Sequence, residues 1–274
     1  MIEFDDGFID NTNILSEQEK QFFDFARDVI PVELYFSSDR NFNEFTYEIV
    51  YGSSKLEDNS YNIFEVQRLL DVGVAAKQKT KEETLMIENI KMSNDYIIDL
   101  IKSDIKGIDL RTIKDIYSLN AIGLLKNENA IGQVRHNVVF ISGTDYKPID
   151  NPFLLEEKMR RIIDNTNKIE HPIESAIYLH NNLSYLQYFE DVNKRTARTA
   201  MMFRMMQDGY FPILFGLMDV IDYKTSLANY YETGSHEKFV QVFVDAYKKM
   251  TEQYKLSVEQ VKEVKQQAKH RLGM

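Results

Sequence analysis

The apolar positions of this sequence recur mainly at helical spacing. Downstream of Pro172, the residues Ala176, Leu179, Leu183 and Leu186 follow one another at steps of three and four, a stripe that is typical of a helix facing a core. Proline suits the first turn of such a helix, where its missing N–H is not needed. The pattern therefore predicts a helix that begins at Pro172 and ends near Leu186.

A second, more uniformly apolar helix is predicted shortly afterwards. Most positions from Ala197 to Met206 are apolar, so this helix should be buried on nearly all sides. Gly209 and Pro212 mark its end. The segment between the two helices is rich in charged residues, which means that a charged loop opens a buried helix.

Similar patterns predict helices over much of the rest of the chain. One follows an Asn62–Glu65 capping box, and the others cover residues 81–100, 109–125, 152–165, 237–250 and 258–271. The best β-prone run is Val138, Val139, Phe140 and Ile141, which is closed by turn residues and predicts a hairpin within residues 132–148. We expect a mainly α fold with one short β-hairpin.

Composition narrows the classes of protein to consider. The 274 residues carry 43 acidic and 33 basic side chains, a net charge of −10, which argues against a nucleic-acid-binding surface. The absence of cysteine excludes disulfides, thiolate zinc sites and cysteine nucleophiles. No apolar run approaches the roughly 20 residues that cross a bilayer, and the acidic N-terminus does not resemble a signal peptide. We expect a cytoplasmic protein without a membrane partner.

The charged loop has the composition of a phosphate site. The first N–H groups of a helix are unpaired and carry partial positive charge, so an anion is stabilised there. Asn193, Lys194 and Arg195 would add donors, and Arg198 lies on the same helical face as Arg195. Asp191 could hold a divalent cation, because Mg²⁺ in nucleotide sites is bound by one or two carboxylates plus phosphate oxygens. The same charges would also suit a solvated helix start with surface salt bridges.

The loop resembles the signature of Fic-domain proteins, His-x-Phe-x-Asp/Glu-x-Asn-Gly/Lys-Arg-x-x-Arg, which joins two helices of a helical bundle. The matching residues are Phe189, Asp191, Asn193, Lys194, Arg195 and Arg198. The resemblance implies transfer of AMP from ATP to a hydroxyl of a target protein. It further implies that Asp191 holds Mg²⁺, that Asn193, Lys194 and Arg195 bind the α- and β-phosphates, that Arg198 reaches the γ-phosphate, and that Phe189 is a buried anchor.

Gln187 stands where the family has its catalytic histidine, the general base that accepts the proton of the target hydroxyl. An amide can orient a hydroxyl but cannot accept its proton, and loss of a positioned base typically lowers a rate by ~10²–10⁴. Val192, in place of a small residue, is a lesser departure. We expect structural or surface roles for all five histidines. If one of them replaces the missing base, His136 is the best candidate, because it lies in the predicted flap.

Two further segments resemble family elements. Ser53 and Glu57 match the motif of an inhibitory helix, in which the glutamate pairs with the second arginine of the loop and occupies the space of the γ-phosphate. The region of Val138, Val139, Phe140 and Ile141 corresponds to a hairpin flap beside the active site. By the resemblance, a target protein docks on this flap by adding a strand.

The resemblance predicts three parts: an N-terminal helical extension (1–44), a Fic-like domain with the inhibitory motif (45–250) and a C-terminal helix (251–274). Two hypotheses about function remain. The chain could be a nucleotidyltransferase with lost or altered activity that binds ATP with Mg²⁺ and is inhibited by Glu57. Alternatively, it could be a signalling module that binds a nucleotide or a protein through the flap and catalyses nothing.

Overall fold

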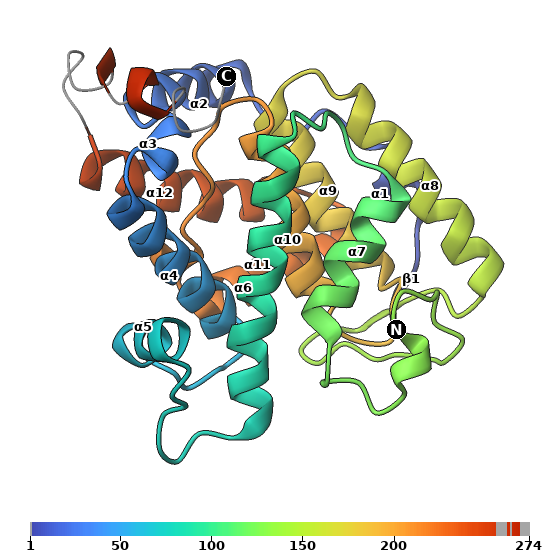
Figure 1. Cartoon of the computed structure of the whole chain (residues 1–274). Helices are drawn as coiled ribbons and strands as arrows, with labels where there is room; N and C mark the ends of the chain where they lie inside the picture. The colour runs from blue at the N-terminus through green and yellow to red at the C-terminus, as the bar shows by residue number, and fades with distance from the viewer. Residues whose placement is uncertain (1, 256–261, 264, 269–274) are drawn as a thin grey trace.

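The computed structural model describes residues 2–255, 262–263 and 265–268. These residues are mainly helical, as the sequence predicts (Figure 1). The helices are α1 (Asp6–Asp10), α2 (Glu17–Val29), α3 (Glu33–Phe36), α4 (Asp39–Lys55), α5 (Ile63–Val72), α6 (Lys81–Lys102), α7 (Leu110–Ala121), α8 (Pro152–Lys168), α9 (Pro172–Leu186), α10 (Asn193–Met206), α11 (Val220–Thr233) and α12 (Glu237–Gln253). The two strands are β1 (Ile2–Glu3) and β2 (Tyr146–Lys147), and two single 3₁₀ turns occur at Glu128–Ala130 and Phe215–Leu217.

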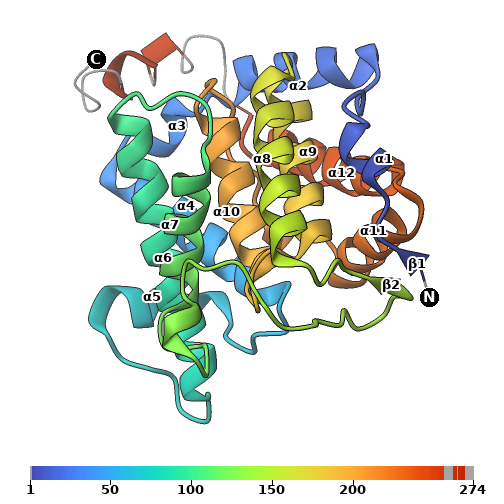
Figure 2. The ribbon, with the colours of Figure 1, turned by 90° about the vertical axis from the view of Figure 1, so that its right-hand side faces the viewer.

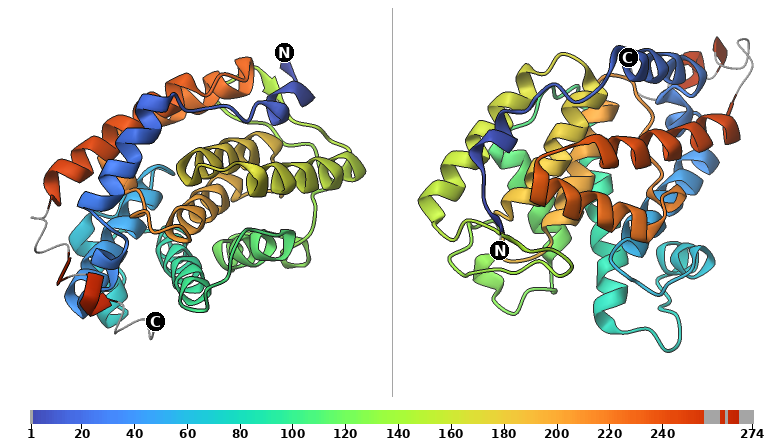
Figure 3. Two further views of the ribbon diagram at one scale, coloured as in Figure 1. Left: turned by 90° about the horizontal axis from the view of Figure 1, so that it is seen from above. Right: turned by 180° about the vertical axis from the view of Figure 1, so that it is seen from behind.

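Helices α9 and α10 form the centre of the bundle. They pack along each other, with α6 and α7 against α10 and α8 against α9 (Figure 2). In the view from behind, α11 and α12, drawn in orange and red, lie on the opposite side of α9 from α7 (Figure 3). All residues of α9 after its first are buried. The loop between α9 and α10 therefore follows a helix that is buried along almost its whole length.

The predicted helices agree well with the observed ones. Helix α9 has the predicted bounds, and α5 begins with the predicted capping box, in which Asn62 and Glu65 bond to each other's backbone N–H groups. Helix α10 begins at Asn193, earlier than the apolar stripe alone indicated, and α7 ends at Ala121, where Gly123 follows at a positive φ. The helix expected over 258–271 lies largely outside the described residues.

The structure corrects the predicted hairpin. Residues 138–141 form no strand, and the small sheet instead pairs β1 with β2 in parallel, Ile2 opposite Tyr146 and Glu3 opposite Lys147. A β-prone run forms a strand only when a partner strand satisfies its backbone groups, and none lies beside residues 138–141 in the described part of the chain. Val138 and Phe140 are instead exposed, by 49% and 83%.

Two other expectations can be compared with the fold. Helix α4 runs across residues 44 and 45, where the sequence predicts the first boundary between parts of the chain. Among the described residues, every helix is too short or too polar to cross a membrane.

Candidate functional site

The loop between α9 and α10 is a tight turn with two left-handed residues. Gln187 has φ 50° and Val192 has φ 64°, and the second is unusual because a β-branched residue seldom adopts a positive φ. The side chain of Asn193 holds this turn: its Oδ1 accepts from the N–H of Phe189 at 2.9 Å, and its Nδ2 donates to the Phe189 carbonyl at 2.9 Å. The strain at Val192 is thus balanced by hydrogen bonds within the loop.

Phe189 anchors the turn to the core. Its ring is 1% exposed and stacks on that of Tyr117, with ring centres 3.6 Å apart and planes 4° from parallel. The anchor that the resemblance implied is therefore present. Its partner Tyr117 was not singled out in the sequence, because nothing local relates α7 to the loop.

The side-chain amide of Gln187 forms hydrogen bonds with residues in and next to the loop. The Nε2 group donates to the carbonyl of Ser184 at 2.7 Å, and the Oε1 atom accepts from Nδ2 of Asn193 at 3.1 Å. The side chain faces the cavity described below. It is oriented as a hydrogen-bonding group and has no basic atom to accept a proton.

Glu57 lies in the turn after α4 and meets the loop cations. Its Oε1 is 2.9 Å from Nη1 of Arg198, and its Oε2 is 3.7 Å from Nζ of Lys194. Arg198 is fully buried and also donates to Ser53, through Nε to the hydroxyl at 2.9 Å and through Nη2 to the carbonyl at 3.1 Å. The structure thus brings together Ser53, Glu57 and Arg198, as the two motifs predicted from distant parts of the sequence.

The charges around Glu57 set its ionisation. Burial alone would raise the pKa of Glu57, but the charges of Arg198, Lys194 and Arg195 outweigh it and hold this pKa below its ordinary value. Burial would likewise lower the pKa of Arg198, but Tyr223 and Glu57 raise it. Glu57 and Arg198 are therefore a charged, hydrogen-bonded pair at neutral pH.

Glu57→Gln is expected to destabilise the folded chain by about 1.5–3 kcal/mol at neutral pH, because it removes the charge that Arg198 faces. Since folding lowers the pKa of Glu57, its stabilising effect is fully present above its ordinary value of 4.5 and is lost as the pH falls below that value. Chemical denaturation of both proteins between pH 7 and pH 3 measures the difference. A difference that stays constant over this range would contradict the pairing.

Arg195 differs from Arg198 because two of its guanidinium nitrogens, Nε and Nη1, are buried without a hydrogen bond among the described residues. The residue as a whole is only 7% exposed. Burial lowers the pKa of Arg195, whereas the charges of Glu57 and Asp191 raise it. A buried guanidinium with unpaired donors is costly, and an anion bound beside it would remove that cost.

A cavity of about 390 Å³ opens beside the loop. Gln187, Asp191 and Lys194 line it from the loop, and Glu57 lines it from the end of α4. Its other walls come from residues 140–144 and from α11: Phe140, Ile141, Ser142, Thr144, Lys224, Leu227, Ala228 and Tyr231, together with Asp58. The cavity is therefore charged at the loop and partly apolar farther away.

A larger hollow of about 770 Å³ lies at the opposite end of α9. Two of its cations are paired with acids: Lys20 lies 3.2 Å from Glu174, and Arg27 lies 3.8 Å from Asp24. The smaller cavity is instead lined by the loop residues Gln187, Asp191 and Lys194. The chemistry of the chain therefore points to the smaller cavity.

Asp191 is the candidate ligand for Mg²⁺. Its Oδ1 accepts from the N–H of Val192 at 2.6 Å, and the residue lines the cavity. Within the described residues, no three His, Asp or Glu side chains gather to hold a metal without a substrate. A single carboxylate fits Mg²⁺ that is otherwise bound by phosphate oxygens and water.

Arg135, which sequence reasoning did not single out, fixes the segment that covers the cavity. It is 1% exposed and donates through Nε to the Gln187 carbonyl at 2.5 Å, through Nη1 to the Asn137 carbonyl at 2.7 Å, and through Nη2 to the Ile149 carbonyl. We call residues 136–145 the flap segment; it crosses the lower end of the bundle towards β2 (Figure 2). Its start is thus tied to the loop.

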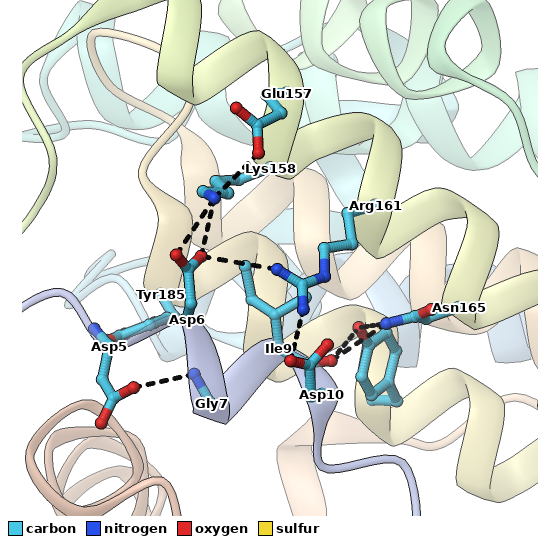
Figure 4. A network of polar contacts seen from close by, with 11 residues as sticks. Asp5, Asp6, Gly7, Ile9, Asp10, Glu157, Lys158, Arg161, Asn165 and Tyr185 are labelled. Carbon is cyan, nitrogen blue, oxygen red and sulfur yellow. Dashed lines mark hydrogen bonds and ion pairs between the residues drawn. The ribbon is translucent and has the colours of Figure 1, made fainter.

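The end of the flap segment is held by the N-terminus of the chain. Strand β1 pairs with β2, and the backbone N–H of Asp5 donates to the Tyr185 hydroxyl at 2.8 Å. Figure 4 shows how Asp6 reaches Lys158 at 2.9 Å, while Asp10 pairs with Arg161 on the same face of α8. Residues 2–10, which carry no sequence motif, therefore contribute to the site indirectly.

Comparisons with known proteins show a family match for part of the chain. Residues 99–204 match the model of the Fic/DOC family. The chain is 26% identical over 268 residues to the protein adenylyltransferase Fic of Nematostella vectensis. The aligned region covers 91% of this chain and 58% of that protein. It spans about half the length of the curated relatives it matches.

Two solved structures share the fold. Fic-1 from C. elegans superposes with a TM-score of 0.67 at 19% identity, covering 90% of this chain and 70% of the other. A Fic domain containing signaling protein from Bacteroides thetaiotaomicron superposes with a TM-score of 0.63 at 15% identity, covering 94% and 97%. The helical bundle described above is therefore the fold of these proteins.

Proposed function

The chain contains a Fic/DOC family domain at residues 99–204, and from its site we propose that it binds the triphosphate of ATP, with Mg²⁺, at the loop between α9 and α10. The observation that carries this proposal is Arg195, a buried cation whose Nε and Nη1 donors have no partner in the described chain. Such donors beside a helix N-terminus are suited to phosphate oxygens.

Each side chain of the loop then has a distinct task. Lys194 and Arg195 would bind the α- and β-phosphates, and Asp191 would hold the Mg²⁺ that offsets their charge. Asn193 bonds mainly to the loop itself, so its principal contribution is the shape of the turn. The partly apolar walls of the cavity suit the base and ribose of a nucleotide.

Arg198 is the residue that ATP would have to share with Glu57. The carboxylate of Glu57 occupies Nη1 of Arg198 at 2.9 Å, and by the family resemblance the γ-phosphate needs the same donor. Two anions cannot occupy it together, so Glu57 competes with the nucleotide. We propose that the chain is autoinhibited in this way.

The reaction that the relatives' name indicates, adenylyl transfer to a protein hydroxyl, needs a base to accept the hydroxyl proton. Gln187 occupies the position of that base and has no basic atom. The binding half of the site is thus present without the proton-accepting group, and transfer by the unmodified chain should be slower by roughly 10²–10⁴ than with a positioned base.

Replacing Arg195 by methionine tests the phosphate site. We expect the free protein to be as stable as the wild type or more stable, because the change removes a buried charge with unpaired donors. In a Glu57→Gly background the same change should weaken Mg-ATP binding by roughly 10- to 100-fold. Thermal denaturation and calorimetric titration measure the two effects.

Arg135→Met is the matched control for stability. Arg135 is also buried, but its donors bond to three backbone carbonyls, so this change should lower the melting temperature. If Arg195→Met leaves ATP affinity unchanged, Arg195 is not a phosphate ligand and the proposal fails.

The alternative, a non-catalytic module that binds a protein partner, is favoured by a different observation. Phe140 is 83% exposed at the centre of the flap segment, whose two ends are fixed by Arg135 and by β2. An exposed aromatic on a tethered segment suits a docking surface. If neither the wild type nor Glu57→Gly binds Mg-ATP, this second function becomes the better one.

A further inference from the structure

A row of buried polar side chains lies beside Arg198, outside the Fic signature. Tyr223 of α11, His180 and Asn181 of α9, and His236 before α12 are each at most 4% exposed. Nη1 of Arg198 is 3.1 Å from the Tyr223 hydroxyl, which is 3.1 Å from Nε2 of His180. Nδ1 of His180 is 2.8 Å from Oδ1 of Asn181, and Nδ2 of Asn181 is 2.9 Å from Nδ1 of His236.

The bond from Arg198 has a fixed direction, and we infer the direction of the other bonds from it. Arginine can only donate, so the Tyr223 oxygen accepts from Arg198, and its single hydrogen is free for Nε2 of His180. Burial lowers the pKa of both His180 and His236 to about 3, so both rings are neutral. His180 therefore carries its hydrogen on Nδ1 and donates to Asn181, which in turn donates to His236.

The reverse order would leave the hydrogen of the Tyr223 hydroxyl unpaired, next to Arg198. Turning the amide of Asn181 around would make Nδ1 of His180 an acceptor and put the ring hydrogen on Nε2. The Tyr223 oxygen would then accept from both neighbours, and its own hydrogen would face no acceptor. The order that begins at Arg198 leaves its one unpaired hydrogen at the far end of the row, on Nε2 of His236, which has no partner among the described residues. It therefore keeps the Tyr223 hydroxyl fully bonded beside Arg198, where an unmade buried hydrogen bond would be costly.

This direction matters for Arg198. Its other partners, Ser53 and Glu57, both lie at the end of α4, whereas Tyr223 belongs to α11. We propose that the row of Tyr223, His180, Asn181 and His236 is a positioning device, which keeps the Tyr223 oxygen facing Arg198 so that this arginine stays directed at the γ-phosphate when Glu57 is withdrawn. The inference rests on the proposed function and assigns positioning residues to the same site.

The test compares two nucleotides in the Glu57→Gly background. Tyr223→Phe removes only the hydroxyl and keeps the ring that lies 5.7 Å from the Arg198 guanidinium carbon. We expect calorimetry to show Mg-ATP binding weakened by about tenfold and Mg-ADP binding changed by less than about twofold, because ADP lacks the phosphate that Arg198 contacts.

Tyr230→Phe is the matched control. Tyr230 also lies on α11 and is fully buried, but its hydroxyl donates to Oδ1 of Asn182, away from Arg198. This variant should bind both nucleotides as the Glu57→Gly protein does. A Tyr223→Phe protein that loses affinity for ATP and ADP equally, or for neither, would overturn the positioning role.

A second measurement does not depend on nucleotide binding. Long-range ¹H–¹⁵N correlation of the imidazole rings should show His180 with its hydrogen on Nδ1 and His236 with its hydrogen on Nε2. The opposite tautomer at His180 would contradict the row even if nucleotides bind as expected. Failure of the Glu57→Gly protein to bind either nucleotide, with both tautomers as expected, would instead reject the proposed function and with it the use of the row in nucleotide binding.

Discussion

Glu57→Gly is expected to raise the affinity for Mg-ATP by roughly 10- to 100-fold, the usual value of one hydrogen bond to a charged group. In the wild type, ATP has to displace the carboxylate that lies 2.9 Å from Arg198 and 3.7 Å from Lys194. In the variant both cations are free for phosphate. Calorimetric titration of the two proteins with Mg-ATP measures the change directly.

Asp58→Gly is the matched control for this prediction. It removes the neighbouring carboxylate and the same unit of charge, but Asp58 pairs with Lys224 at 2.6 Å and its side chain is 76% exposed. We expect little change in affinity, because exposed ion pairs contribute little. If Asp58→Gly raises ATP affinity as much as Glu57→Gly does, the effect is one of net charge and the competition of Glu57 with ATP is disproved.

Gln187→His in the Glu57→Gly background is expected to raise the rate of AMP transfer by about 10²–10⁴, because it adds a base at the position that the family uses. The backbone of Gln187, at φ 50°, can accept this change, since histidine is enriched among non-glycine residues with positive φ. Incubation with labelled ATP and cell lysate, followed by detection of label on protein, measures the rate.

Gln187→Asn separates the base from the backbone. Asparagine also favours a positive φ and keeps an amide, but it has no basic atom, so this variant should transfer no faster than the Glu57→Gly protein. Arg198→Ala gives the background level. Label at that level in the histidine variant would mean that more than the base is missing, and the binding module would become the better description.

The parts of this fold that the sequence predicts are those set by local pattern. Helix α9 begins at Pro172 because proline fits a first turn, and its apolar stripe defines the buried face. The Asn62–Glu65 capping box is likewise local, since both bonds lie within one turn. The resemblance of Ser53 and Glu57 to an inhibitory-helix motif predicted the pairing of Glu57 with Arg198.

The remaining features depend on contacts between distant parts of the chain. Residues 138–141 have the composition of a strand, but strand formation also needs a partner, and β2 found its partner in β1 instead. Arg135 bonds to three backbone carbonyls. Every residue has a backbone carbonyl, so the sequence does not indicate which ones Arg135 will contact. The role of Tyr223 appears only when α11 is packed beside α9 and α10.

The pairing of β1 with β2 is also expected to be locally less stable than the rest of the fold. It joins residues near the start of the chain to residues near its middle, so a long loop must close before these bonds form, and the entropic cost of closure rises with loop length. The pairs that support it, such as Asp10 with Arg161, are part-exposed and individually weak. In a hydrogen-exchange experiment, we expect the backbone amides of β1 and β2 to exchange through local opening of the two strands. The amides of α9 and α10 should exchange only when the whole protein unfolds. When the pairing of β1 with β2 opens, the flap segment would become more mobile, while the loop between α9 and α10 keeps its conformation.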